Sequence, residues 1–199
     1  MEFQRVVATR KMVRSFEDRP IPPETVQRIV RNAQRGPSAG FSQGVELLVL
    51  EGTGQLAGYW SVIDATEGSQ SAPKWPAFRN APLIIAFVSD KKAYLDRYAK
   101  PDKEWTKMAE ETLRPVPFWD IDAGMAALLV LLTAVDADLG ACFVGVVDQP
   151  AFKARFGIPE RMAVVGCVLI GYPLAADAPS PSLARGRRPA ADVIHYGKW

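Results

Sequence analysis

The sequence is poor in the side chains that most hydrolases and metalloenzymes use. Its 199 residues include a single histidine, His195, and only two cysteines, Cys142 and Cys167. These three side chains are too few for a conventional zinc site without much carboxylate help, and a lone histidine near the C-terminus argues against a hydrolytic triad. We therefore expect no metal site, a structural role for the histidine, and two buried, unpaired thiols.

Signatures of hydrolytic and nucleotide-binding enzymes are also missing. The chain has no phosphate-binding Walker loop and no Gly-x-Gly-x-x-Gly after a strand, and its Gly-x-Ser-x-Gly pattern at residues 36–40 follows an expected helix instead of the strand that a nucleophile elbow needs. The lack of a strand-borne elbow argues against an α/β-hydrolase, and the lack of Gly-x-Gly-x-x-Gly argues against a Rossmann site for a nicotinamide cofactor. Because the chain has few side chains suited to acid–base or metal chemistry, we expect a bound organic cofactor to provide the reactivity.

Long hydrophobic runs are absent as well. The longest apolar run covers residues 123–135, which is short of the ~20 residues that a bilayer requires. Asp120, Asp122, Asp136 and Asp138 bracket this run closely. We therefore expect a helix buried in a protein core rather than a membrane span.

Charge of one sign does not dominate the chain. The net charge is only +2, which is less than the broad basic field that nucleic-acid binding usually needs. Basic residues gather instead within 5–19 and 185–188, which fits a small anionic ligand better than a polyanion. No charged-then-apolar leader opens the chain, so we expect a cytoplasmic protein. Apolar residues make up 48% and charged residues 23%, a balance that predicts one domain over residues 1–199.

Hydrophobic periodicity and breaker residues predict a chain of helices and strands. One helix is expected to begin at Pro22-Pro23 and to end before Gly36-Pro37, because proline suits the first turn and glycine the end. Three strands are continuously apolar, which predicts a sheet covered on both faces. The other expected helices span 2–9, 53–65, 91–98, 120–138 and 150–156, the expected strands span 45–50, 82–89, 142–147 and 163–170, and loops are expected over 67–80 and 101–117.

The most informative stretch of the chain lies between residues 10 and 43. It opens with the cationic cluster RKMVRSF, residues 10–16, and closes with the loop GPSAGFSQ, residues 36–43. Because a guanidinium fork matches phosphate oxygens with two parallel hydrogen bonds, Arg10 and Arg14 are candidates to grip a phosphate. The small loop residues leave backbone N–H groups open to a flat ligand. Together these features predict a phosphorylated planar cofactor; the competing interpretation is a solvated basic turn before an ordinary helix–loop–strand link.

Both ends of the chain resemble one known family. Residues 10–16 and 36–43 are similar to the N-terminal signature of the nitroreductase family of FMN-dependent oxidoreductases, roughly Arg-Arg-Ser-x-Arg-x-Phe and then Ala-Pro-Ser-Ala-Gly-Asn-Ser-Gln-Pro. Residues 171–173 (GYP), 187–189 (RRP) and 195–199 (HYGKW) resemble the family's Gly-Tyr-Pro and its closing Arg-Arg-Pro and His-Tyr-x-x-Trp. The ordered set extends over essentially the whole chain and is more specific than any one motif.

The resemblance implies an α+β fold: a three-layer sandwich with a central, mostly antiparallel sheet flanked by helices, and an extended C-terminal arm. It also implies a homodimer with FMN sites at the interface, in which the arm, residues 174–199, packs on the partner subunit. The composition of the arm agrees with this expectation, because Val193, Ile194, Tyr196 and Trp199 are poorly suited to water. Taken alone, the proline and alanine content of the first part of the arm is typical of a disordered tail.

The family pattern, carried onto this sequence, gives a set of FMN contacts. Cationic residues near both ends hold the phosphate, the small-residue loop of the other subunit lies against the flavin, and the backbone of residues 142–145 lies near the flavin N5 and O4. The expected cofactor-binding residues are Arg10, Lys11, Met12, Arg14, Pro37, Ser38, Ala39, Gln43, Val144, Gly145, Arg187 and Arg188. No side chain is expected to act as acid or nucleophile, since the reactive atom is N5 of the flavin.

Four departures from the family pattern bear on the cofactor site. Met12 replaces a serine and so removes a hydroxyl group from the cationic cluster, and Gly44 replaces a proline. Val146 replaces the second glycine of a pair and is expected to crowd the backbone near N5. Phe41 replaces an asparagine and is expected to narrow the pocket or to add a stacking face.

The resemblance implies that NADH or NADPH reduces bound FMN, leaves, and is replaced by an electron-poor acceptor such as a nitroaromatic or a quinone. One site used in turn predicts ping-pong kinetics. The expected substrate wall consists of Phe41, Trp75 and Phe118, with ordinary packing as the alternative. Two other functions stay open: a protein that stores FMN with little turnover, and a reductase that uses a deazaflavin. Neither a nucleic acid nor a membrane is expected as a partner.

Overall fold

The computed structural model describes residues 1–66, 75–113 and 116–199, in which helices cover both faces of one sheet. The helices are α1 (Phe3–Thr9), α2 (Pro23–Ala33), α3 (Gly52–Ala65), α4 (Lys91–Tyr98), α5 (Phe118–Asp136) and α6 (Gln149–Phe156). The strands are β1 (Val45–Glu51), β2 (Leu83–Ser89), β3 (Gly140–Val144) and β4 (Ala163–Gly171). The short 3₁₀-helices are η1 (Ala39–Phe41), η2 (Pro76–Asn80), η3 (Glu104–Thr106), η4 (Glu111–Leu113), η5 (Pro181–Arg185) and η6 (Ala190–Asp192).

The helices and strands expected from the sequence are confirmed, and only the ends of α5 and β3 differ from the expected positions by more than one residue. The helix α5 begins at Phe118, two residues earlier than expected. It also ends two residues earlier, because Asp138 takes a left-handed φ of 56° and the Leu139 N–H turns back to a carbonyl of the last turn. The strand β3 covers 140–144 rather than 142–147, since its pairing with β4 stops there. The expected loops contain η2, η3 and η4, and residues 67–74 and 114–115 of these loops lie outside the described residues.

The sheet has the order β1-β2-β4-β3, and each pair of neighbours is antiparallel. Phe87 on β2 lies opposite Leu47 on β1 and Gly166 on β4, while Cys142 on β3 lies opposite Leu169 on β4. This arrangement confirms the predicted antiparallel sheet and places β3 at one edge of it.

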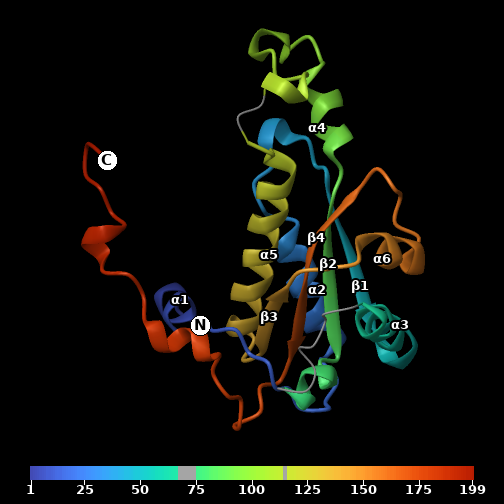
Figure 1. Cartoon of the computed structure of the whole chain (residues 1–199), viewed down its shortest axis with the longest axis vertical. Coiled ribbons are helices and arrows are strands. Elements are labelled where there is room, and N and C mark those ends of the chain that lie inside the picture. The colour runs from blue at the N-terminus through green and yellow to red at the C-terminus, as the bar shows by residue number, and fades with distance from the viewer. Residues whose placement is uncertain (67–74, 114–115) are drawn as a thin grey trace.

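Alternate residues of β2 point to opposite faces of the sheet, as the pleat requires. Leu83, Ile85 and Phe87 lie in a core shared with α2 and α5, while Ile84 and Ala86 lie in a second core with α3 and α6. Figure 1 shows these two layers of helices on either side of the sheet. Because both faces are covered, every residue of β2 is buried, which explains the continuous apolar run and confirms the predicted three-layer α+β sandwich.

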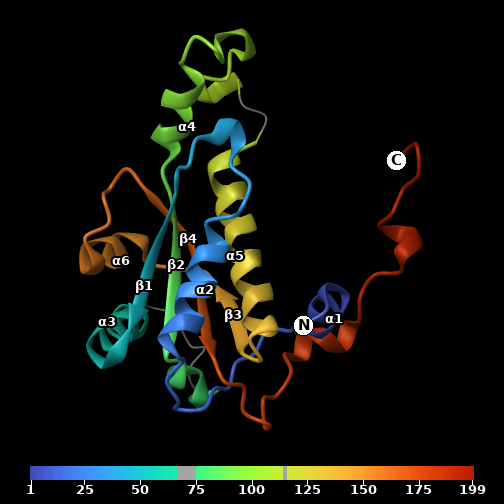
Figure 2. The same ribbon diagram turned by 180° about the vertical axis from the view of Figure 1, so that it is seen from behind.

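The helix α5 is long and apolar enough, by length and composition, to cross a membrane. Here one side of it packs along the sheet and α2, where Ala123, Val130 and Ala134 are fully buried, as expected for a core helix (Figure 2). The other side is also apolar, and Met125 and Leu128 on it are 42% and 48% exposed. An apolar face of this kind is suited to a protein partner.

The helix α6 follows the end of β3 and is capped by a side chain. The Asp148 carboxylate accepts a hydrogen bond of 2.9 Å from the Ala151 N–H. Because an N-cap of this type contributes about 1 kcal/mol, we expect Asp148→Ala to lower the melting temperature by about 2–4 °C in a thermal scan. Asp148→Ser keeps a capping oxygen and should melt close to the wild type; equal melting of the alanine variant would show that the cap does not contribute.

The C-terminal arm leaves the body of the molecule after β4. It is attached at its base, where the Leu174 N–H donates to the Ser15 carbonyl at 3.0 Å, and it then runs outward to an end well away from the sheet (Figure 1). Its apolar residues are exposed in the single chain, with Tyr196 at 89% and Trp199 fully exposed. The arm is therefore extended, as expected.

Both cysteines are free and buried, as expected from the sequence. Burial raises the pKa of the Cys167 thiol, and it also raises the pKa of Cys142, although the nearby Arg14 guanidinium opposes the shift there. Protonated thiols of this kind are poor nucleophiles, so neither cysteine is a candidate for covalent catalysis.

Candidate functional site

The predicted phosphate-binding cluster lies beside the edge strand of the sheet. After α1 the chain becomes extended, and Met12 forms a parallel bridge with Ala141 while the Val13 N–H donates to the Ala141 carbonyl at 3.0 Å. The Met12 sulfur accepts from the Phe143 N–H at 3.4 Å. The structure thus brings the cationic cluster next to the end of β3, where Val144 and Gly145 were expected to contact the flavin.

The cationic cluster already holds one carboxylate of its own chain. Asp177, at the base of the arm, accepts a 2.8 Å hydrogen bond from the Arg14 backbone N–H, and its other oxygen lies 3.7 Å from Lys11 Nζ. The Arg14 guanidinium lies over the ring of Trp75 at 5.1 Å. Among the described residues, Arg10 and Arg14 form no side-chain ion pair, so their guanidinium groups are available to a further oxyanion.

The backbone at the end of β3 is open on one side. Gly145 is exposed, and a Cβ placed on it would meet no atom within 4 Å. Val146 was expected to crowd this backbone, but its side chain is only 9% exposed and packs into the core under α3 and α6. The expected crowding is therefore not seen, because the valine side chain fills the core instead of the open side.

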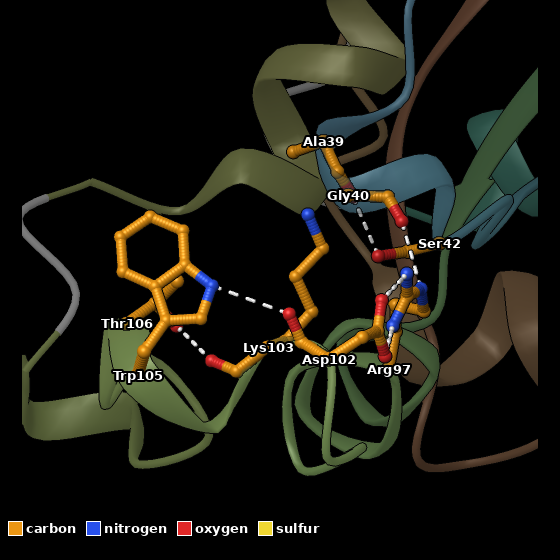
Figure 3. A network of polar contacts seen from close by, with 8 residues as sticks. All are labelled: Ala39, Gly40, Ser42, Arg97, Asp102, Lys103, Trp105 and Thr106. Carbon is orange, nitrogen blue, oxygen red and sulfur yellow. Dashed lines mark hydrogen bonds and ion pairs between the residues drawn. The ribbon is translucent and has the colours of Figure 1, made fainter.

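The small-residue loop lies at the other end of α5. Its Ala39 N–H donates to the buried carboxylate of Asp122 at 2.8 Å, and the Tyr94 hydroxyl donates to the same oxygen at 2.7 Å. The Arg97 Nε donates to the Gly40 carbonyl at 2.9 Å (Figure 3). Two neighbouring residues of the loop are thus held through their backbone by groups on α4 and α5.

The loop backbone is conformationally strained. Gly40, Phe41 and Gln43 all have a positive φ, at 62°, 55° and 52°. A side chain in this left-handed region costs roughly 1–2 kcal/mol, so the two non-glycine residues must be held there by their surroundings. Gly40 has no room for a side chain, because a Cβ would lie 2.7 Å from Cε2 of Tyr98. Phe41 is 73% exposed, so its ring is presented outward.

The polar segment after α4 is tied to the same loop. Arg97 donates to both oxygens of Asp102 at 2.9 and 2.7 Å, and the Trp105 indole N–H donates to the Asp102 carbonyl at 3.2 Å (Figure 3). The Arg97 guanidinium holds the pKa of the Asp102 carboxyl below its usual value. Arg97 therefore links the loop to the excursion that carries the exposed indole of Trp105.

One chain does not bring all the predicted site residues together. The loop contacts Asp122 near the start of α5, whereas the cationic cluster lies beside β3, which follows the end of α5 at Asp136. At 1.5 Å per residue these two aspartates are roughly 20 Å apart along the helix. The expected substrate residues divide in the same way, since Phe118 begins α5 on the loop side and Trp75 lies by the cluster.

The two arginines expected from the arm lie in its exposed part. Arg187 and Arg188 follow η5, and the Arg188 guanidinium donates to the Asp192 carbonyl at 2.7 Å. Among the residues described, neither arginine bonds to the cationic cluster of the same chain. Their predicted role at the phosphate stays a prediction.

A comparison with known families decides where the chain belongs. The model of the nitroreductase family matches residues 7–172, which is most of the chain. The chain belongs to the nitroreductase family. The resemblance found in the motifs is thereby confirmed, and the matched range contains both the cationic cluster and the small-residue loop.

Relatives of this nitroreductase-family chain occur in archaea and bacteria. A protein of Archaeoglobus fulgidus is 27% identical over 176 residues, which are 86% of each chain. Its name describes it as a candidate NADH dehydrogenase/NAD(P)H nitroreductase. A nitroreductase family protein from Clostridium difficile 630 has the same fold, with a TM-score of 0.72, 19% identity and full coverage of both chains. An FMN-dependent nitroreductase from Clostridium difficile R20291 gives a TM-score of 0.67 at 19% identity and 98% coverage of both chains.

Several residues of the candidate site were not predicted from the sequence. Asp122 was predicted only to flank the apolar run, although an acid beside an apolar helical run is itself a signal for a buried polar contact. Tyr94, Arg97 and Asp177 have no local signal, because their partners are distant in the sequence.

Proposed function

We propose that the chain is an FMN-dependent NAD(P)H oxidoreductase that works as a homodimer. The observation that carries this proposal is the cationic cluster with Arg10 and Arg14, which Met12 fixes against β3 just before the exposed Gly145 backbone. Membership of the nitroreductase family and the name of the archaeal relative support NADH or NADPH as the electron donor.

The residues at this place fit the chemistry of FMN. The cluster already binds an oxyanion, because the Asp177 carboxylate accepts a hydrogen bond from the Arg14 backbone N–H. The guanidinium groups of Arg10 and Arg14 stay available for a phosphate. The open side of Gly145 leaves its backbone accessible to the edge of a flat ring. We assign the phosphate to Arg10, Lys11 and Arg14, and the ring edge to Val144 and Gly145.

Bound FMN would supply the two-electron chemistry, taking up hydride equivalents from NAD(P)H and giving them to the acceptor. The protein would contribute binding, orientation and a site that the donor and the acceptor use in turn. We propose an electron-poor acceptor such as a nitroaromatic or a quinone, with Phe41 and Phe118 on the acceptor side. The two buried free thiols agree with a reducing cytoplasm.

The separation within one chain supports the proposed homodimer. A ligand on the cationic cluster lies roughly 20 Å along α5 from the loop of the same chain, so we assign the loop to the site of the second subunit. The exposed apolar side of α5, with Met125 and Leu128, and the apolar end of the arm supply surface for such an interface. The proposed partners are thus a second copy and a small acceptor, and neither a nucleic acid nor a membrane.

The first test of this function is the chromophore. We expect the purified protein to show a flavin spectrum and to release about one FMN per chain on denaturation, and NADH or NADPH to bleach it rapidly without oxygen. Mass analysis separates FMN from a deazaflavin. A bound flavin that no nicotinamide reduces would favour storage of FMN, and a colourless protein that takes up no FMN would overturn the proposal.

The order of substrate binding is a separate prediction. Because donor and acceptor share one site, double-reciprocal plots of initial rate against donor at several acceptor concentrations should be parallel. A quinone is a convenient acceptor for this measurement. Lines that intersect would show that donor and acceptor bind together, and would contradict the shared site.

A further inference from the structure

Asp122 is a charged residue in an apolar position. It lies on α5 among buried residues of the sheet-facing core and is 4% exposed. Such a carboxylate is costly to bury unless it is fully hydrogen-bonded. Its two donors among the described residues come from outside α5: the Tyr94 hydroxyl of α4 at 2.7 Å and the Ala39 backbone N–H of the loop at 2.8 Å. The carboxylate therefore binds the loop and Tyr94 at one oxygen.

Tyr94 also fills the place next to the end of the loop. Its side chain is fully buried, and a Cβ on Gly44 would lie 2.5 Å from its Cε2 atom. Gly44 stands where proline is common in the family, and a proline ring would collide with this tyrosine. Gly44 is therefore required by Tyr94: glycine lacks the fixed φ of a proline, but it leaves room for the buried tyrosine ring beside the loop.

The contacts of Tyr94 extend to the start of the loop. Burial and Asp122 raise the pKa of Tyr94, and Ser38 lies close enough to oppose this shift. The Ser38 oxygen in turn accepts a 2.8 Å hydrogen bond from the Gln43 N–H. The Asp122 carboxylate therefore joins Tyr94 to Ala39, and the bond between Ser38 and Gln43 closes the strained segment 38–43.

We propose that Asp122 and Tyr94 are positioning residues that set the conformation of the loop 38–43 for the flavin of the partner subunit, in the place of the proline that Gly44 replaces. This inference rests on the proposed function. Their effect is indirect: the carboxylate that binds Tyr94 also holds the backbone of Ala39, and the loop then presents its surface to the cofactor.

The test uses Tyr94→Phe and Asp122→Asn, which keep the shape of each side chain. In the protein without cofactor, we expect the Ala39 amide to exchange its hydrogen about tenfold faster in either variant. The dissociation constant of FMN, measured by fluorescence titration of the same protein, should rise about five- to tenfold. Thr133→Val is the matched control, because it removes another buried polar contact of α5, the 3.0 Å bond from Asn32, without touching the loop.

The outcomes separate this inference from the proposed function. Faster exchange with weaker FMN binding in both variants, and neither in Thr133→Val, supports it. If all three variants lose the same affinity in step with their melting temperatures, the pair is only structural and the inference is overturned. If the wild type binds FMN and both variants bind it equally well, this inference alone fails. A wild type that takes up no FMN overturns the proposed function, and the flavin role of the pair with it.

Discussion

Replacing Arg10 and Arg14 together by alanine is expected to raise the dissociation constant of FMN by about 10²-fold or more. Each guanidinium is proposed to make a charge-assisted contact with the phosphate, and such a contact contributes ~1.5–3 kcal/mol. Two contacts of this size exceed the ~2.7 kcal/mol that a 10²-fold change requires. The measurement is fluorescence titration of cofactor-free protein with FMN, together with the flavin content after purification.

The fold should survive this double substitution. The Arg14 contact that holds the arm uses its backbone N–H, which alanine keeps, and neither guanidinium forms an ion pair among the described residues. Arg19→Ala is a matched control, since Arg19 is an exposed cation that stacks 3.8 Å over the Tyr172 ring and lies outside the cluster. An unchanged FMN affinity in the double variant, or an equal loss in the control, would remove the phosphate assignment.

The layers of the fold were predictable because they rest on local patterns. The continuous apolar run of β2 predicts a strand covered on both faces, and all of its residues are buried. The proline pair at the start of α2 and the glycine after it marked that helix well. The ends of α5 and β3 were missed, because they depend on the left-handed Asp138 and on where the pairing with β4 stops.

The candidate site was only partly predictable for a different reason. The cationic cluster and the loop have recognisable motifs, but their positions relative to each other depend on the length of α5. The contacts that hold the loop come from Tyr94, Arg97 and Asp122, which are far from it in the sequence. The resemblance supplied the general pattern of the site, whereas these supporting contacts became visible only in the three-dimensional arrangement.

Removing residues 179–199 should convert the protein to a monomer and abolish tight FMN binding. The deletion keeps Asp177, which binds the cluster, and Ala178, whose carbonyl accepts from the Trp75 indole at 3.3 Å. It removes the exposed apolar end of the arm, including Tyr196 and Trp199. Without a partner the site loses the loop contacts of the second subunit, and three hydrogen bonds of ~1 kcal/mol each correspond to about 10²-fold in affinity.

Light scattering after gel filtration gives the mass, and titration of the same sample gives the FMN affinity. The full-length variant Arg187→Ala/Arg188→Ala separates the two roles expected of the arm, because it keeps the apolar residues and removes the cations. We expect this variant to stay dimeric and to bind FMN more weakly, whereas the deletion should lose both the dimer and the cofactor. A deleted chain that stays dimeric would show that the outer side of α5 is sufficient for assembly. A monomer that still binds FMN tightly would show instead that the loop of the second subunit is not part of the site.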